Sequence, residues 1–253
     1  MNVLASLEDK YDVTLYTIVE PDLDELNSYY NTDVSSIEIN RLGALGLGMG
    51  WLAETASNLA DITFGRLQSA ILNRYLDRQD FDLVISTYNE FSFDTPAIQY
   101  IHYPNFGVER QSLVYKLYDG LCDTIDGFDK SQIKQSTLLA NSEWTANVAS
   151  DIYGVKPDVL YPPIDTEEFD PLPWEDREQG FVTIGRLEPS KRIIQNIDIV
   201  ERLRRAGHDV HLHIVGPAFH GQYSEKVKER ASDRSFISLE GEITRERLVE
   251  LVC

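Results

Sequence analysis

The chain contains few cysteines and no secretion signal, and each shortage excludes a class of protein. Its 253 residues include two cysteines, Cys122 and Cys253, which lie 131 positions apart. This excludes a disulfide scaffold, and we expect both to remain thiols in a reducing compartment. The N-terminus lacks the basic and long apolar stretches of a signal peptide, so we expect none. A hydrophobic content of 42% still suffices for ordinary buried cores and excludes wholesale disorder.

Positive charge is also scarce, and it is unevenly distributed. The chain has 23 Lys+Arg, of which eight are Lys, against 42 Asp+Glu, and its formal net charge is −19. We therefore expect no nucleic-acid partner, because such proteins carry a basic footprint. Residues 1–178 contain 11 basic and 31 acidic side chains, whereas residues 179–253 contain 12 and 11. Any site for an anionic ligand is thus expected in the C-terminal part.

An acidic, lysine-poor surface is typical of a protein that works in concentrated salt. Charge of one sign favours solubility there, and the salt screens the repulsion between the carboxylates. The composition therefore suggests a halophilic habitat, and we expect the chain to lose structure when salt is removed. Thermal unfolding followed across a salt series checks this prediction. An unchanged structure at low salt would contradict it.

Residues 42–60 form the most apolar window, but it is a poor membrane span. The window contains Glu54 and four glycines, whereas a span needs about 20 apolar residues with few charges. One interpretation is a Gly-rich loop followed by a buried helix. The other is an amphipathic segment that touches a bilayer surface. We accordingly predict a cytoplasmic protein, either fully dissolved or bound peripherally to the cytoplasmic membrane face. The apolar side chains of the second interpretation are Leu45, Leu47, Met49, Trp51 and Leu52.

Strand-like and helix-like segments alternate along the chain. This order predicts an α/β fold with parallel sheets covered by helices on both faces. The Pro-rich, acidic segment 161–180 is the predicted linker. We therefore predict one domain over residues 1–160 and a smaller one, with about three strands, over residues 181–253. The predicted strands are 12–19, 36–39, 82–86, 98–102, 137–140, 158–161, 181–184, 210–215 and 236–239.

The segment GRLEPSK at residues 185–191 is the strongest candidate for ligand binding. It joins a predicted strand to a predicted helix over residues 191–206, for which Ser190 is the expected N-cap and Gly207 the stop. Ligands bind at this edge of open α/β sheets, and a helix N-terminus favours phosphate.

Two cations and one glycine give this segment its chemistry. Gly185 allows the backbone to approach a ligand, Arg186 can bind phosphate oxygens in a bidentate fork, and Lys191 adds a point charge. Cations without a carboxylate cluster indicate a diphosphate neutralised by side chains rather than by a metal. An ordinary strand-to-helix loop with surface cations is the open alternative.

Further candidates lie at the ends of two strands of the first domain. His102 can bond a sugar hydroxyl or transfer a proton, or it can be structural. Asn141 and Ser142 begin a helix, either as its cap beside a packed Trp144 or as the lining of an interdomain cleft. The other histidines, at 208, 211, 213 and 220, lack supporting ligands, so no metal is expected. The sequence has no nucleophile elbow, Walker loop or Gly-x-Gly-x-x-Gly motif.

Taken in order, these motifs resemble glycosyltransferase family 4. Its members are retaining sugar-nucleotide transferases of the GT-B fold, in which two Rossmann-like, doubly wound domains face a cleft. The matching stretches are residues 101–104, 140–145, 159–165 and 185–191, extended by 213–216 and 241–243. The first of them, residues 101–104, is most similar to mannosyltransferases of the dolichol-pathway kind.

The resemblance implies a role for each matching residue. His102, Arg186 and Lys191 would be catalytic, and the donor would also contact Gly185 and Gly216. The implied partners are a nucleotide-sugar donor, carrying mannose or another hexose, and a glycan or lipid-linked acceptor, with no cofactor or metal. The cleft would be lined by Tyr103, Asn141, Ser142 and Pro163.

The sequence also departs from the family pattern. It starts after the family's first strand and Gly-rich loop, and it ends before the expected Glu-x7-Glu segment. Glu242 and Glu250 have the right separation but lack its glycine context. We therefore expect a chain truncated at both ends, with an incomplete second domain. A catalytically inactive remnant or interaction module is the alternative function, and a GT-B epimerase acting on sugar nucleotides is a third.

Overall fold

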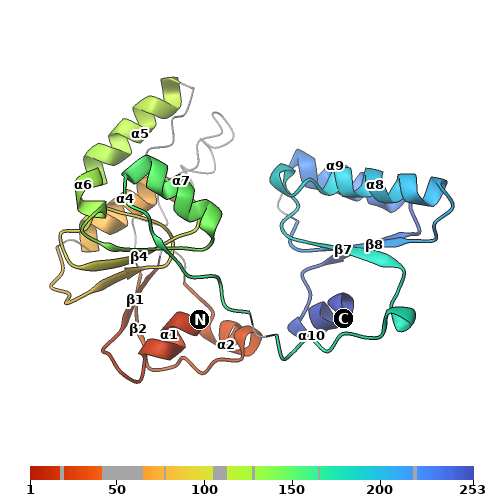
Figure 1. Cartoon of the computed structure of the whole chain (residues 1–253), viewed down its shortest axis with the longest axis horizontal. Helices are drawn as coiled ribbons and strands as arrows, with labels where there is room; N and C mark the ends of the chain where they lie inside the picture. The colour runs from red at the N-terminus through yellow and green to blue at the C-terminus, as the bar shows by residue number, and fades with distance from the viewer. Residues whose placement is uncertain are drawn as a thin grey trace. The chain divides into compact units, whose positions relative to one another are not determined.

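The chain folds into two compact units, residues 1–163 and 164–253 (Figure 1). The computed structural model describes residues 1–17, 20–41, 65–76, 78–104, 113–126, 129–164, 166–218 and 221–253. Its strands pair in parallel and its helices connect them, which confirms the predicted α/β class. The division between the units falls within the Pro-rich segment 161–180.

The strands of unit 1 pair as two separate parallel sheets. The first sheet pairs β1 with β2, and its register places Leu15 opposite Ile39. The second sheet has the order β3-β4-β5-β6. Figure 1 draws α5 and α7 on one side of β4, and β1 and β2 on the other. The described elements of this unit are α1 (Asn2–Leu7), β1 (Thr14–Thr17), α2 (Leu23–Tyr30), β2 (Glu38–Arg41), α4 (Gly65–Leu76), β3 (Val84–Ser86), β4 (Ala97–Ile101), α5 (Leu113–Asp126), α6 (Lys130–Ile133), β5 (Thr137–Ala140), α7 (Glu143–Tyr153) and β6 (Asp158–Val159).

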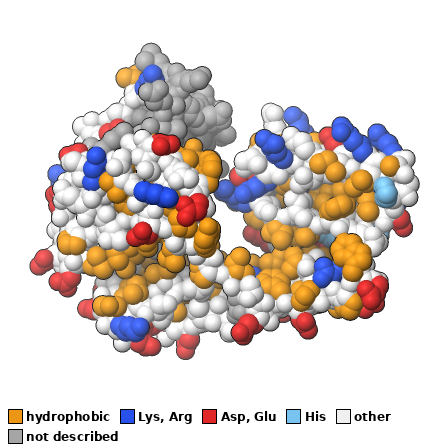
Figure 2. Space-filling view, viewed as in Figure 1, with side chains coloured by type: hydrophobic (Ala, Val, Ile, Leu, Met, Phe, Trp, Pro, Cys, Tyr) orange, Lys and Arg blue, Asp and Glu red, His pale blue; other side chains and the backbone are white. Residues whose placement is uncertain are grey.

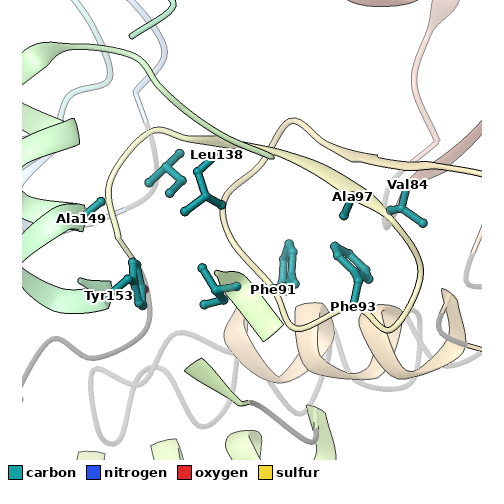
Figure 3. Close-up of a cluster of buried hydrophobic side chains, with 9 residues drawn as sticks. Val84, Phe91, Phe93, Ala97, Leu138, Ala149 and Tyr153 are labelled. Atoms are coloured by element: carbon teal, nitrogen blue, oxygen red, sulfur yellow. The ribbon is translucent and has the colours of Figure 1, made fainter. Parts of the chain in front are cut away.

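The core of unit 1 lies between the β3–β6 sheet and the helices that follow its strands. Alternate residues of β4 are buried, so Ile101 points into this core while its neighbour Tyr100 is half-buried. Burial of one such aliphatic side chain contributes about 1.5–3 kcal/mol. The core therefore holds the carboxyl ends of the strands at fixed positions. Its buried members are Val84, Phe91, Phe93, Ala97, Ile101, Ile133, Leu138, Ala149 and Tyr153 (Figure 3).

Unit 2 has a three-stranded parallel sheet in the order β7-β8-β9, which is the predicted number of strands. Leu212 and Ile214 of β8 point to the face covered by α8 and α9, where they pack against Ile197 and Val227. Figure 1 draws α10 on the opposite side of the sheet. The elements are η1 (Trp174–Asp176), β7 (Gly180–Ile184), η2 (Pro189–Lys191), α8 (Ile193–Arg205), β8 (His211–Val215), α9 (Gln222–Ser232), β9 (Ile237–Gly241) and α10 (Arg245–Val252).

The entry into α8 differs from the prediction, because Ser190 is not its N-cap. Pro189 starts a short 3-10 turn, Arg192 follows in the left-handed conformation with φ 53°, and the α-helix begins at Ile193. The Ser190 hydroxyl instead donates to Glu188 Oε1 at 2.6 Å. Pro189 presets the backbone φ of the turn. The Ser190 hydroxyl is bonded to the Glu188 carboxylate and therefore does not cap the helix. At the other end, Gly207 has φ 96° and follows the last turn, as predicted.

Unit 2 carries a larger share of the basic side chains, as the composition indicates. Figure 2 shows Lys and Arg side chains gathered along the edge of unit 2 where α8 and α9 lie.

None of the described helices combines the length and the apolar character that a bilayer span needs. The apolar window at residues 42–60 lies outside the described residues. Cys122 is buried and forms no disulfide with Cys253.

Candidate functional site

Two neighbouring strands of unit 1 bring His102 and Asn141 together. His102 follows β4 and Asn141 follows β5, and parallel pairing places both strand ends at one edge of the sheet. The Asn141 side-chain amide donates to the His102 carbonyl at 3.1 Å, and its backbone N–H donates to Ile101 at 3.2 Å. The two residues thus form one fixed corner of the edge where ligands of α/β sheets bind.

Ser142 caps the start of α7. Its hydroxyl oxygen accepts the Thr145 N–H at 3.2 Å, which is the N-cap interaction. The Thr145 hydroxyl donates in turn to the His102 carbonyl at 3.3 Å. Ser142 therefore fixes the first turn of α7, from which Thr145 donates to the His102 carbonyl. Pro163 is exposed and is the last residue of unit 1.

The imidazole of His102 is exposed and has a defined orientation. Its Nε2 lies 3.0 Å from the carbonyl oxygen of Thr87, and its ring packs edge-on against Tyr100 with centroids 4.9 Å apart. Because a carbonyl only accepts, Nε2 carries the proton toward it, and Nδ1 of the neutral ring is the acceptor. His102 can therefore accept a hydrogen bond from a hydroxyl group at Nδ1.

Asn89 fixes the backbone of this histidine, and no sequence pattern pointed to it. Asn89 is buried, and its Oδ1 accepts the N–H groups of both His102, at 3.0 Å, and Tyr103, at 3.2 Å. The Ser86 hydroxyl donates to the Asn89 carbonyl at 2.5 Å. Asn89 and His102 are thirteen positions apart in the sequence. Only the pairing of β3 with β4 brings them together.

Replacing Asn89 with Ala is expected to lower the free energy of unfolding by about 2 kcal/mol. Two backbone N–H groups lose their acceptor, and an unsatisfied buried donor costs about 1–3 kcal/mol. Urea unfolding measures the change. Asn2→Ala is the control, because Asn2 is exposed in α1 and its loss should stay within about 0.5 kcal/mol. Equal stability of the two variants would show that Asn89 does not hold the loop.

In unit 2, two glycines let the ends of β7 and β8 approach each other closely. Gly185 has φ 148° and Gly216 has φ 135°. The Gly185 N–H donates to Val215 at 2.9 Å, and a Cβ built on Gly216 would lie 2.3 Å from the Gly185 carbonyl oxygen. No side chain fits at Gly216, so the backbone of Gly185 and Gly216 lies in close contact at the ends of β7 and β8.

Arg186 and Lys191 lie beside these glycines. The aliphatic stem of Lys191 runs along Gly185, since a Cβ there would meet Lys191 Cδ and Cε at 3.4 Å. Arg186 Nη2 lies 3.3 Å from Glu188 Oε1, and the Arg186 side chain is 58% exposed. Leu187 between them is buried in the core of unit 2. The loop thus presents two exposed cations from an anchored backbone, at the entry to α8.

Glu188 is a partner of this loop that the sequence did not single out. It accepts from both Arg186 and Ser190, so a ligand phosphate must compete with its carboxylate for Arg186. The partial positive charge of the α8 N-terminus favours an anion, as the two cations do.

A hollow of about 540 Å³ in unit 2 lies at the opposite end of α8, away from this loop. It is lined by Glu201, Arg204, Arg205, Asp233, Arg234 and Phe236.

Both histidines of β8 pair with carboxylates. His211 Nδ1 lies 2.7 Å from Glu178 Oε1, and His213 lies between Glu178 Oε2, at 3.2 Å, and Glu240 Oε1, at 2.7 Å. Within the part of the chain that the structure describes, no group of His, Cys, Asp and Glu side chains could hold a metal ion. His220 and Asp165 lie outside that part.

These contacts make Glu178 a pH-dependent contributor to stability. The hydrogen bond from His211, helped by His213 and opposed by partial burial, holds the pKa of Glu178 below its ordinary value of 4.5. A lowered pKa stabilises the fold above the ordinary value, and this stabilisation is lost as pH falls through the lowered one. We expect Glu178→Gln to lower the melting temperature at pH 6 and to have no effect at strongly acidic pH.

Glu175→Gln is the matched control for Glu178→Gln, because Glu175 is an exposed carboxylate of the same segment. Thermal melts of the three proteins across acidic pH make the comparison. The same pH profile for both variants would contradict the pairing of Glu178 with the histidines.

The predicted site residues thus form two sets, one in each unit. His102, Tyr103, Asn141 and Ser142 share the carboxyl edge of the β3–β6 sheet. The second set, Gly185, Arg186, Lys191 and Gly216, shares the carboxyl edge of the β7–β9 sheet. Each set lies at the edge where α/β folds bind ligands.

Comparisons with known proteins give little beyond a distant structural likeness. No family model matches the sequence, and no curated protein matches it. Among the solved structures that match is AviGT4, described as a glycosyltransferase involved in avilamycin A biosynthesis. The identity is 15% and the TM-score is 0.41, over 72% of this chain and 46% of the other. The chain therefore spans about half the length of that structure.

Proposed function

We propose that the chain is a retaining glycosyltransferase of the GT-B type that binds a nucleotide-sugar donor at residues 185–191 of unit 2. The supporting observation is the meeting of Gly185 and Gly216 with Arg186 and Lys191 at one sheet edge. Close backbone approach, two cations and a helix N-terminus together suit a diphosphate. The proposed donor sugar is mannose or another hexose, and the acceptor is a glycan or a lipid-linked sugar.

In this proposal the cations act on the leaving group. The bond from the anomeric carbon to the diphosphate oxygen breaks, and its electron pair stays on the diphosphate beside Arg186 and Lys191. An acceptor hydroxyl bonds to the same face of that carbon, and its proton passes to the departing phosphate oxygen. Charge develops on the diphosphate during this step, so preorganised cations lower the barrier. His102 of unit 1 would accept a sugar hydroxyl at Nδ1.

Arg186 has to leave Glu188 to reach the donor. The two groups form a partly exposed ion pair, with exposed side-chain fractions of 58% for Arg186 and 31% for Glu188, and surface pairs contribute about 0–1 kcal/mol. In this contact a doubly charged diphosphate would replace the carboxylate. The reaction needs no metal or cofactor in this scheme. We place the protein in the cytoplasm, with residues 42–60 as its peripheral contact with a membrane.

Calorimetric titration of the full chain with UDP, GDP and ADP, and with their hexose conjugates, tests the donor site. We expect one base series to bind, and we expect Arg186→Ala to weaken that binding at least tenfold, as for the loss of a charged hydrogen bond. Arg202→Ala, an exposed arginine late in α8, should bind like the unmodified chain. Absence of binding by every nucleotide to the folded chain would overturn the proposal.

A further inference from the structure

An exposed aromatic side chain follows each strand of the β3–β6 sheet. Tyr88, Tyr103 and Tyr161 each lie two residues after β3, β4 and β6, and Trp144 lies four residues after β5. Because the strands are parallel, all four positions belong to one edge. Their exposed fractions are 60%, 48%, 64% and 61% in that order. Exposed apolar surface gathered in one place is typical of an interaction site.

Two of these rings form a stacked pair. The ring centroids of Tyr103 and Trp144 are 5.9 Å apart, and their planes differ by 20°. The backbone that carries each ring is held in place, because Asn89 accepts the N–H of Tyr103 and Ser142 caps the helix that carries Trp144. The sequence had allowed a packed tryptophan at this position, whereas the structure leaves most of its surface open.

Residues with hydrogen-bonding side chains adjoin the stacked pair in the chain and in the sheet. The imidazole of His102 precedes Tyr103, and the amide of Asn141 lies at the adjacent strand end. A sugar ring has one chemistry on its face and another on its rim: its C–H bonds carry partial positive charge toward an aromatic face, and its hydroxyls need polar partners. A flat apolar surface with a few convergent polar groups matches both needs.

The net charge of unit 1 as a whole disfavours an anionic ligand. Residues 1–163 contain 24 acidic side chains and 10 basic ones. The cation nearest to Trp144 along α7 and its following loop is Lys156, which lies 3.4 Å from Glu143 in an ion pair. A nucleotide would stack its base here but would bring phosphates into an acidic unit. A neutral ring fits the surface without that repulsion.

We infer that the Tyr103–Trp144 pair binds a neutral sugar ring of a glycan chain. Adjacent strands lie about 4.8 Å apart, so rings following four strands extend over about 14 Å. This is longer than one sugar ring, and the row therefore suits a chain of sugars, with Tyr88 and Tyr161 toward its ends. Naming this glycan the acceptor rests on the proposed glycosyltransferase function, whereas the binding itself does not.

A glycan microarray probed with the labelled full chain, with no donor present, tests the inference. We expect neutral oligosaccharides to be retained by the unmodified protein and by Trp174→Ala. We expect about tenfold weaker retention by Trp144→Ala, and partial retention by Trp144→Phe, which keeps an aromatic face. Trp174 is the matched control because it is also an exposed tryptophan, at 74% against 61% for Trp144, and belongs to unit 2. Melting curves show that each variant folds.

Two outcomes would overturn the glycan site. The first is equal retention of every neutral glycan by the unmodified protein and Trp144→Ala, including no retention by either. The second is retention of anionic glycans alone. Calorimetry with nucleotides, performed on the same variants, separates this result from the fate of the donor site. Glycan binding without any nucleotide binding would leave the aromatic site standing and remove the transferase.

Discussion

Gly216→Ala is expected to cost about 3 kcal/mol or more of unfolding free energy and to abolish nucleotide binding. The new Cβ would lie 2.3 Å from the carbonyl oxygen and 2.7 Å from the carbonyl carbon of Gly185, both backbone atoms that cannot rotate away. The φ of 135° adds a strain of about 1–3 kcal/mol for any residue with a side chain. Relief of the contact requires β7 and β8 to separate at the edge that carries Arg186 and Lys191.

Gly241→Ala separates the two causes. Gly241 also has a positive φ, of 70°, but a Cβ there meets no atom within 4 Å. We therefore expect only the backbone strain, about 1–2 kcal/mol, and retained nucleotide binding. Urea unfolding read by circular dichroism, with calorimetry on the folded variants, gives both quantities. If Gly216→Ala proves no more damaging than Gly241→Ala, the close approach of the strand ends is unimportant.

Removal of either loop cation is expected to slow sugar transfer by about 100–1,000-fold. This corresponds to about 2.7–4 kcal/mol, the range measured when one preorganised donor to a developing negative charge is removed. Arg186→Ala tests the guanidinium. For Lys191 the better substitution is Met, because its stem packs along Gly185 and should be preserved. The rate constant at saturating donor is the quantity to compare, since charge develops on the diphosphate in the transition state.

The Arg202→Ala protein is the control for these rates, as it is for binding. Rates that fall equally in all three variants would indicate a general effect on the fold or on charge steering. Unchanged rates for Arg186→Ala and Lys191→Met would remove the two residues from the mechanism, even if the chain proves to be a transferase.

The alternation of segments predicted most strands and helices of the described chain because each carries its own apolar pattern. The places of His102 and Asn141 at the ends of strands were also predicted, whereas their contact appears only in the structure, where β4 and β5 pair in parallel. Both inferences depend on local sequence and on a general rule of topology. They needed no knowledge of particular side-chain contacts.

What the sequence did not predict depends on competition between local groups or on distant ones. Ser190 has the right type and position for an N-cap, but Glu188 takes its hydroxyl and Pro189 starts a 3-10 turn. The local sequence does not mark Asn89, because its hydrogen bond with His102 forms only when β3 and β4 pair. The exposure of Trp144 likewise follows from which face of α7 packs on the sheet, where Ala149 and Tyr153 are the buried residues.

The fate of the donor is the most direct test of the account. The purified full chain is incubated with the sugar nucleotide that calorimetry selects and with the glycans retained on the array, and products are read by mass spectrometry and NMR. We predict release of the nucleoside diphosphate together with a glycan one sugar longer, linked with the anomeric configuration of the donor. A folded chain that binds donor and glycan but releases no nucleoside diphosphate would contradict the proposed activity.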